Sequence, residues 1–285
     1  MKTKNNYLLL AATSLLLLGF TSCSKDDSTS SQKLDIYLTD GPGDFDAVFI
    51  DITSVEIKVD TSVAHRHDDR FGDNDGHGDD HLQRRDGFGV WQTVNFTPGV
   101  YDVLQLRNGI DSLIASTTVN GTVRKIRFTL GTNNSVVVGG VTYPLTLINP
   151  TNNFLYVNLN DRHRGRGNGG SMAVWVDFDL GRSIVYANGV YYLKPVLRPF
   201  CNTNFGEIEG RVLPLAAQAT VKVYNNTDTA VAIPNPDGRF KVRGLTPGNY
   251  SVLIDGTSPY IDTTFTNVNV TAGRDTRLGE ITLRQ

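Results

Sequence analysis

The sequence predicts an all-β protein made of two antiparallel β-sandwich domains in tandem. Three observations lead to this prediction. Apolar residues recur at every second position over many short runs, which is the period of a half-buried strand. Glycine, asparagine, aspartate and proline interrupt these runs at close intervals. The long helical segments that would connect parallel strands are missing from the pattern, so we do not expect a β/α fold.

The first domain is expected over residues 33–200. It opens with KLDIYLTD, in which Leu34, Ile36 and Leu38 share one face, and AVFIDITSVEIKV continues the alternation. Seven further β-rich runs follow, the longest being MAVWVDFDL and GVYYLKPVL. YDVLQLRNGIDSLIAS is the one stretch of this domain in which we expect a short helix or helical turn.

The second domain is expected over residues 205–285, after a joint at RPFCNTNF. Six β-rich runs lie within roughly 80 residues, which is enough for one small sandwich. Asp237-Gly238 suits a tight turn, and Phe240, Leu245 and Tyr250 are predicted core residues.

The N-terminus has the pattern of a signal peptide over residues 1–22. Lys2 and Lys4 precede an apolar run at residues 7–20, which is shorter than the about 20 residues that a membrane-spanning helix needs. Cys23 follows directly after FTS, and this order resembles a bacterial lipoprotein lipobox, although such boxes usually carry leucine where Phe20 stands. The resemblance implies a lipid on Cys23, and residues 23–32 then form the lipidated cysteine and a flexible tether. The alternative is a secreted protein whose cysteine lies near the cleavage position by chance.

The residues that follow Cys23 point to a place in the cell. Lys25, Asp26 and Asp27 resemble the acidic export signal that certain Gram-negative bacteria place just after the lipidated cysteine. The resemblance implies a lipid-anchored protein in the outer membrane that faces the cell exterior. The alternative is a solvated, charged tether with no signal.

Charge and cysteine content exclude several classes. The formal net charge is −2, so the chain has no basic footprint for a nucleic-acid partner. Once Cys23 carries a lipid, Cys201 is the only thiol left, and an intramolecular disulfide is not possible. Stability must therefore come from apolar cores.

Two families share motifs with the chain. YLTDGPGDFDAVFIDITSVEI and VDFDLGRSIVYANGVYYLKPVLR resemble a bacterial lipoprotein family known as domain of unknown function 4382, over residues 33–200. This resemblance implies no established chemistry. GEIEGRV, PNPDGRF and GLTPGNYSV resemble a carboxypeptidase regulatory-like, or prealbumin-like, domain. That resemblance implies a sandwich without a peptidase site, of a fold shared with carbohydrate-binding-like domains.

An insert at residues 64–89 concentrates histidine and aspartate, the ligand types of Zn²⁺ and related ions. It holds four of the five histidines of the chain. The candidate ligands of a divalent metal are His65, His67, Asp73, Asp75, His77 and His81. The alternative is a solvated loop, because such a loop must lose backbone entropy to close on a metal.

MAVWVDFDL suggests a ligand-binding face. Alternation places Met172, Val174, Val176, Phe178 and Leu180 toward the core. Trp175, Asp177 and Asp179 then share the opposite face, where a ring and two carboxylates could stack on a sugar and accept hydrogen bonds from its hydroxyl groups. The alternative is that a loop or the second domain covers Trp175.

The sequence has no Gly-x-Ser-x-Gly elbow, no His-Glu-x-x-His motif and no phosphate-binding loop motif, so we predict that the protein is not an enzyme. The leading hypothesis is a non-catalytic binding or accessory module on the outer membrane surface, with carbohydrate as the ligand class. The alternative is a structural or adhesive cell-surface protein with protein partners. A metal-dependent hydrolase is third, and no cofactor is expected beyond a divalent metal in the insert.

Overall fold

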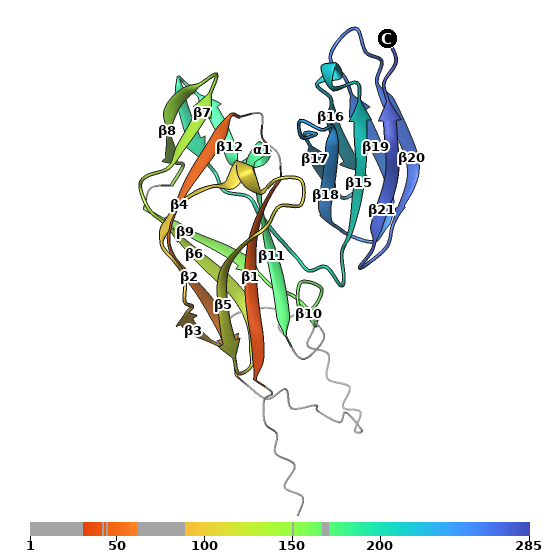
Figure 1. The fold of residues 1–285 in the computed structure, drawn as a ribbon. Helices are drawn as coiled ribbons and strands as arrows, with labels where there is room; N and C mark the ends of the chain where they lie inside the picture. Colours follow the sequence, from red (N-terminus) through yellow and green to blue (C-terminus); the bar gives the residue numbers. More distant parts are fainter. Residues whose placement is uncertain (1–30, 42, 44, 62–88, 150, 167–170) are drawn as a thin grey trace, which may run out of the picture.

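The computed structural model describes residues 31–41, 43, 45–61, 89–149, 151–166 and 171–285. These residues form four β-sheets and short helical turns, so the all-β sandwich class is confirmed (Figure 1). Two sheets make a first unit (residues 31–200) and two make a second unit (residues 206–285).

The first unit contains a five-stranded sheet in the order β10-β11-β1-β5, with β14 also paired to β11. Its strands are β1 (Gln32–Gly41), β5 (Ser112–Val119), β10 (Gly165–Arg166), β11 (Met172–Asp179) and β14 (Leu197–Phe200). β1 and β11 run parallel, which differs from the antiparallel prediction. The chain leaves β1, builds most of the facing sheet and returns, so strands rather than a helix make the crossover.

A nine-stranded sheet faces it, in the order β12-β13-β8-β7-β2-β6-β9, with β3 and β4 also on β2. Its strands are β2 (Ala47–Asp60), β3 (Val90–Thr93), β4 (Gly99–Asp102), β6 (Thr122–Leu130), β7 (Ser135–Val138), β8 (Val141–Leu147), β9 (Phe154–Asn158), β12 (Ile184–Ala187) and β13 (Val190–Leu193). A 3₁₀ turn, η2 (Val103–Leu106), lies where a short helix or helical turn was predicted, and β5 follows it. A short helix, α1 (Leu180–Ser183), follows β11.

The core of the first unit lies between these two sheets. Leu34, Ile36 and Leu38 of β1 are buried there against the inner face of the large sheet. The predicted alternation of β11 is confirmed, because its core-facing residues are all at most 3% exposed: Met172, Val174, Val176, Phe178 and Leu180.

The second unit is a smaller sandwich with its own core. One sheet has the order β18-β15-β21 and the other β17-β16-β19-β20. The strands are β15 (Gly206–Leu213), β16 (Thr220–Tyr224), β17 (Thr229–Ala232), β18 (Arg239–Leu245), β19 (Gly248–Asp255), β20 (Thr263–Val270) and β21 (Asp275–Thr282), and η3 (Leu215–Ala217) follows β15. Phe240, Leu245 and Tyr250 are buried in this core, as predicted.

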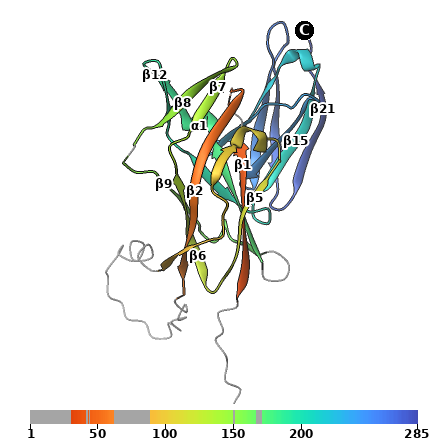
Figure 2. The same ribbon diagram turned by 60° about the vertical axis from the view of Figure 1, so that its left-hand side comes forward.

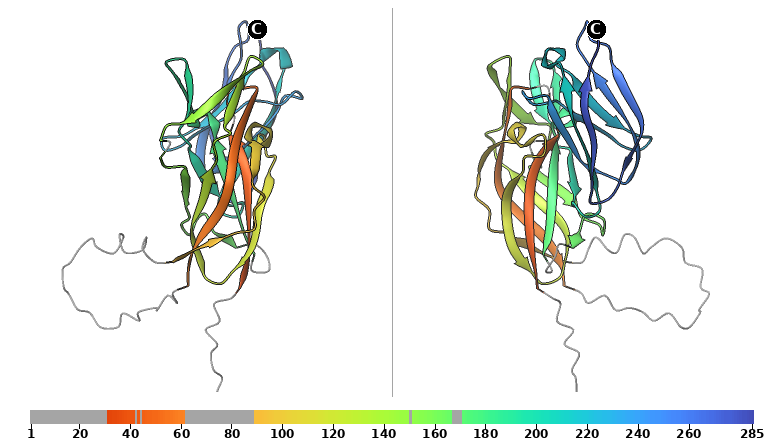
Figure 3. Two further views of the ribbon diagram at one scale, coloured as in Figure 1. Left: turned by 90° about the vertical axis from the view of Figure 1, so that its left-hand side faces the viewer. Right: turned by 45° about the vertical axis from the view of Figure 1, so that its right-hand side comes forward.

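The two units lie side by side. The second unit packs beside the half of the first unit that is away from the start of β1 (Figures 1, 2 and 3). A small apolar cluster of Phe200, buried Cys201 and Phe205 fills the joint, with Trp175 packed against it. The two separate cores support the domain limits given above, which remain a prediction. No helix in the described part of the chain has the length and hydropathy needed to cross a membrane.

Candidate functional site

The residues predicted to bind sugar lie on β11, at the contact between the two units. Trp175, Asp177 and Asp179 do project from the face opposite the core. That face is not free, because Asp177 is only 6% exposed and Trp175 is half-buried. The geometry therefore favours the alternative in which the second unit covers this face.

Trp175 is enclosed by protein groups. Its ring stacks on Tyr37 of the parallel neighbour β1, with 4.9 Å between centroids and 11° between planes. Phe200 lies 6.0 Å away, and the indole Nε1–H donates a hydrogen bond of 2.7 Å to Asp111. Arg243 of β18 places its guanidinium 5.5 Å from the ring centroid, which is within cation–π range.

Arg243 joins this ring to the second unit. Its guanidinium makes an ion pair with Asp111 and a second one, of 3.3 Å, with Glu207. It also donates to the Asn202 side-chain oxygen at 3.2 Å. We call Trp175, Asp111 and Arg243 the covered cluster, because the first two come from one unit and the third from the other.

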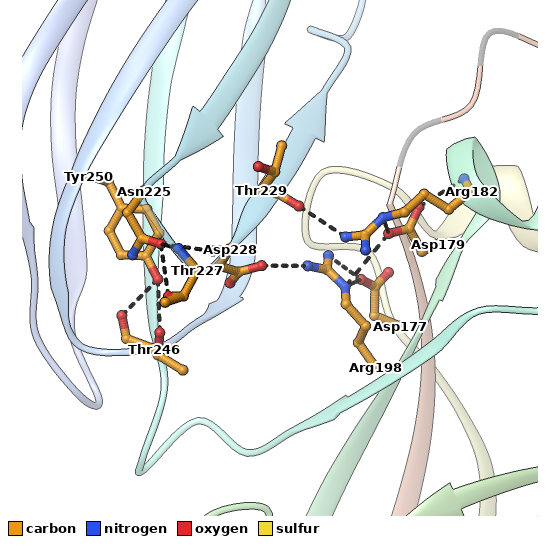
Figure 4. A network of polar contacts seen from close by, with 10 residues as sticks. All are labelled: Asp177, Asp179, Arg182, Arg198, Asn225, Thr227, Asp228, Thr229, Thr246 and Tyr250. Carbon is orange, nitrogen blue, oxygen red and sulfur yellow. Dashed lines mark hydrogen bonds and ion pairs between the residues drawn. The ribbon is translucent and has the colours of Figure 1, made fainter.

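Asp177 is held by an arginine on the neighbouring strand. The β11–β14 register places Arg198 opposite Asp177, and two guanidinium nitrogens donate to one carboxylate oxygen at 2.6 and 3.0 Å. The same guanidinium reaches Asp228 of the second unit at 3.7 Å (Figure 4). Arg198 therefore bridges a carboxylate from each unit.

A tight turn before β17 presents Asp228 to Arg198. The side-chain oxygen of Asn225 accepts hydrogen bonds from the amides of Thr227 and Asp228, at 2.9 and 2.8 Å. Its own amide donates to the Asp228 carbonyl at 2.9 Å, which closes the turn (Figure 4). Asparagine side chains favour such turns because they copy a backbone hydrogen bond.

Asp179 contributes a third link between the units. It caps α1 by accepting from the Arg182 amide at 3.1 Å, and it pairs with the Arg182 guanidinium at 2.9 Å. Arg182 in turn donates to the Thr229 carbonyl on β17 at 3.1 Å (Figure 4).

Asn108 makes a fourth link. Its φ of 56° is in the left-handed region, which asparagine tolerates better than most residues. From there its side chain donates to the Ile233 carbonyl at 3.0 Å and accepts from the Lys241 amide at 3.4 Å. An amide that uses both of its polar ends in this way fixes the relative position of two segments.

Two buried carboxylates near this contact have oxygens without a hydrogen-bond partner in the described part of the chain. Burial raises the pKa of Asp177, and Arg198 offsets only part of that effect. Burial also raises the pKa of Asp40 well above its usual value, and the charges of Asp177 and Asp179 raise it further. Among the described residues, the buried side-chain oxygens without a hydrogen bond are both of Asp40 and one of Asp177. These groups are costly to keep ionised in the folded protein.

A second cluster that combines a tryptophan, an arginine and a carboxylate lies on the outer face of the nine-stranded sheet. Arg127 of β6 pairs with Glu56 of β2 at 2.6 Å, and its guanidinium lies 4.4 Å from the Trp91 ring centroid and 4.9 Å from that of Phe154. The Tyr156 ring lies 6.1 Å from Trp91 and is 48% exposed. We call Trp91, Glu56 and Arg127 the open cluster, because all three residues belong to one sheet of the first unit.

The remaining predicted site residues lie outside the described residues. These are Cys23, Lys25, Asp26 and Asp27 at the N-terminus, and the insert residues His65, His67, Asp73, Asp75, His77 and His81. Within the part of the chain that the structure describes, no group of three or more histidine, cysteine, aspartate or glutamate residues could hold a metal ion.

The pattern of the sequence did not single out Asp111, Arg198, Asp228 or Arg243. Alternation predicts which way a strand residue points, but it does not predict which distant residue meets it. Arg198 could have been found from the pairing of β11 with β14, since it stands directly opposite Asp177. Arg243 carries no such signal, because it belongs to a different sheet and a different core.

The chain matches one family model, described as domain of unknown function (DUF4382), over residues 31–195. Among curated proteins no relative was found.

Several solved structures align with parts of the chain. A type II cohesin–X–dockerin complex from Acetivibrio cellulolyticus is 24% identical over 27% of this chain and 56% of its own, with a TM-score of 0.23. The TIE protein of Bacillus anthracis is 12% identical over 89% of this chain and 34% of its own, with a TM-score of 0.22. A minor pilin of Streptococcus agalactiae is 11% identical over 89% of this chain and 97% of its own, with a TM-score of 0.22. The chain thus spans 56% and 34% of the first two structures.

Proposed function

The chain belongs to the DUF4382 family, whose description assigns no chemistry, and we propose that it is a non-catalytic, surface-displayed lipoprotein with a structural or adhesive role. In this proposal the two sandwiches act as one rigid body that presents a binding surface to a protein partner away from the membrane.

The observation that supports this proposal most is how the charged groups between the units are used. Asp177, Asp179 and Asp228 are each engaged by an arginine, and so is Asp111. A carboxylate that binds an arginine in this way is not available as a general base or nucleophile without first breaking the pair. These groups are better placed to hold two units together than to do chemistry.

The glycan hypothesis gains no support from the same contacts. A sugar that stacked on Trp175 would have to displace Tyr37, Phe200 or Arg243 from its ring faces. It would also compete with Arg198 for Asp177. Sugar binding at Trp175, Asp177 and Asp179 therefore remains an untested prediction, and the protein-partner alternative fits the geometry better.

The sequence supports a lipid anchor on Cys23, and the direction of β1 indicates how an anchored chain would be oriented. FTSC follows an apolar run, and β1 begins at the end of the first unit that lies farthest from the second unit (Figure 1). A lipid on Cys23 would thus present the second unit outward from the membrane. The domain likeness to carboxypeptidase regulatory-like modules is part of the same proposal, since such a module supplies surface and no active site.

Fractionation of cells that express the full chain tests the proposal. Cys23→Ala should move the protein from the membrane fraction to a soluble form or leave it uncleaved, because the lipid is the anchor. Replacing Lys25, Asp26 and Asp27 with alanine should keep the anchor but protect the protein from protease added to intact cells. A Cys23→Ala protein that stays membrane-bound and normally processed would contradict the anchor, and unchanged protease access would remove the export role.

A further inference from the structure

A groove runs between the two units on the side where β1 ends. Its two neighbouring hollows, of about 960 and 520 Å³, share Gly181 and Val231 in their walls. Phe45, Arg107 and the α1 segment make the first-unit wall. β17 makes much of the second-unit wall, on the side of its sheet that faces the first unit (Figure 1).

The groove has an apolar lining that remains exposed. Leu215 is 51% exposed and Val231 is 36% exposed, although each lines the larger hollow beside other apolar side chains. Ile233 and Pro234 continue this surface. Exposed apolar surface at the contact between two packed units is typical of a binding groove.

The charged lining is mostly positive, in a protein whose net charge is −2. Among the residues that the structure describes, four cationic side chains line the two hollows, against one carboxylate, Asp179. Arg182 and Arg198 use that carboxylate. Arg107 and Lys222 make no close ion pair with any residue in the described part of the chain, and Arg107 acts only at longer range on the buried Asp40. An occupant of the groove would therefore meet two positive charges that no carboxylate contacts directly, beside an apolar surface.

We propose that this groove binds an extended, acidic peptide segment of a partner protein, in which aspartate or glutamate alternates with aliphatic residues. The proposal deepens the proposed function, because it says where the protein partner docks and which chemistry it presents. Carboxylates of the peptide pair with Arg107 and Lys222, and aliphatic side chains bury Leu215 and Val231. Phe45 is the only aromatic ring among the described residues that line the groove, which favours a peptide over a sugar that needs rings to stack on.

Selection from a phage-displayed library of random linear peptides of about twelve residues tests this on the purified, lipid-free mature protein. Enriched peptides should be rich in aspartate, glutamate and aliphatic residues, and binding should weaken as salt is raised. Synthetic copies should bind Lys222→Glu and Leu215→Asp proteins about tenfold or more weakly. Lys194→Glu and Ile261→Asp are the matched controls, since both side chains are exposed outside the groove, and they should bind like the wild type.

Three results would overturn the proposal. They are the absence of enrichment over an unrelated protein, enriched peptides that are basic or lack acidic residues, and synthetic peptides that bind both groove variants as tightly as the wild type. Polygalacturonate is the probe for an acidic polysaccharide, and if it binds with the same dependence on Lys222 and no peptide is enriched, the occupant is a glycan. The experiment needs neither lipid nor membrane, so its failure is separate from a failure of the surface anchor.

Discussion

Both tryptophans of the chain rest against an arginine that is paired with a carboxylate, yet the two clusters differ in what they connect. In the open cluster, Trp91, Arg127 and Glu56 stand on neighbouring strands of one sheet. In the covered cluster, Arg243 comes from the second unit and closes over Trp175 of the first.

The two clusters are buried to a similar extent, and they differ in whether they connect the two units. The Arg127 and Glu56 side chains are each 19% exposed, and those of Arg243 and Asp111 are 12% and 24% exposed. Similar burial gives each ion pair a similar local strength. Of these two clusters, only the covered cluster joins the two units. Its loss should therefore lower the free energy of unfolding of both.

The largest contrast is expected between the two rings. Trp175→Ala should lower the free energy of unfolding by about 3 kcal/mol, because it removes a ring packed on Tyr37 and Phe200 and takes the indole donor from Asp111. Trp91→Ala should cost only about 1 kcal/mol, because this ring lies on the outer face of one sheet and does not contact the second unit. Denaturant unfolding of the mature protein measures both values.

A Trp175→Ala protein with an unchanged melting temperature would break this comparison. It would instead support the prediction from strand alternation alone, that Trp175 is an exposed ring available to bind a ligand.

A smaller contrast is expected between the two arginines. Arg243→Ala should cost about 2 kcal/mol and separate the unfolding of the two units into two transitions, since it removes contacts to Trp175, Asp111 and Glu207 together. Arg127→Ala should cost about 1 kcal/mol and leave the number of transitions unchanged. Calorimetry distinguishes the two outcomes, and equal effects from both variants would contradict the link between the units.

The buried carboxyl groups near the covered cluster give a pH dependence. Burial raises the folded-state pKa of Asp40 and of Asp177, so their contribution to stability is fully present below the unfolded pKa of about 3.9 and is lost as pH rises through the folded pKa. Asp40→Asn removes a carboxylate whose oxygens are both unpaired. It should raise stability by about 1 kcal/mol at neutral pH, with an advantage that shrinks toward about pH 4. Chemical unfolding at several pH values measures this, and a variant less stable than wild type at neutral pH would argue for an unseen partner of Asp40.

The smallest effect is expected from the insert between β2 and β3. Replacing residues 65–86 with a short Gly-Ser link should change the free energy of unfolding by less than about 0.5 kcal/mol, since the sequence places no core residue there. If the insert binds metal, titration calorimetry with Zn²⁺ or Ca²⁺ should show saturable heat that this replacement abolishes. Identical melts with and without metal, and no heat, would leave the insert as a solvated loop and remove the metal-dependent hydrolase from consideration.

Strand alternation predicted the inner half of the molecule well. Val174 and Val176 point into the first core and Phe240 and Tyr250 into the second, because side-chain direction along a strand follows from local geometry. The outward direction of Trp175 was predicted for the same reason.

The contact between the units could not be predicted in the same way. Trp175 and Arg243 are far apart in the sequence and belong to different cores, and the parallel pairing of β1 with β11 also spans most of the first unit. Such contacts depend on how finished sheets pack and leave no local pattern. The outward direction of Trp175, Asp177 and Asp179 was therefore predicted, while the arginines that contact them on that face were missed.

A double-mutant cycle between Asp111 and Arg243 tests the link between the units most directly, because each residue belongs to a different unit. Asp111→Ala and Arg243→Ala are measured singly and together by denaturant unfolding that follows the second unit. We predict a coupling energy of about 1.5 kcal/mol, with Asp111→Ala alone lowering the stability of the second unit. Effects that add within about 0.5 kcal/mol, together with an unchanged stability of the second unit in Asp111→Ala, would contradict a link between the units through this pair.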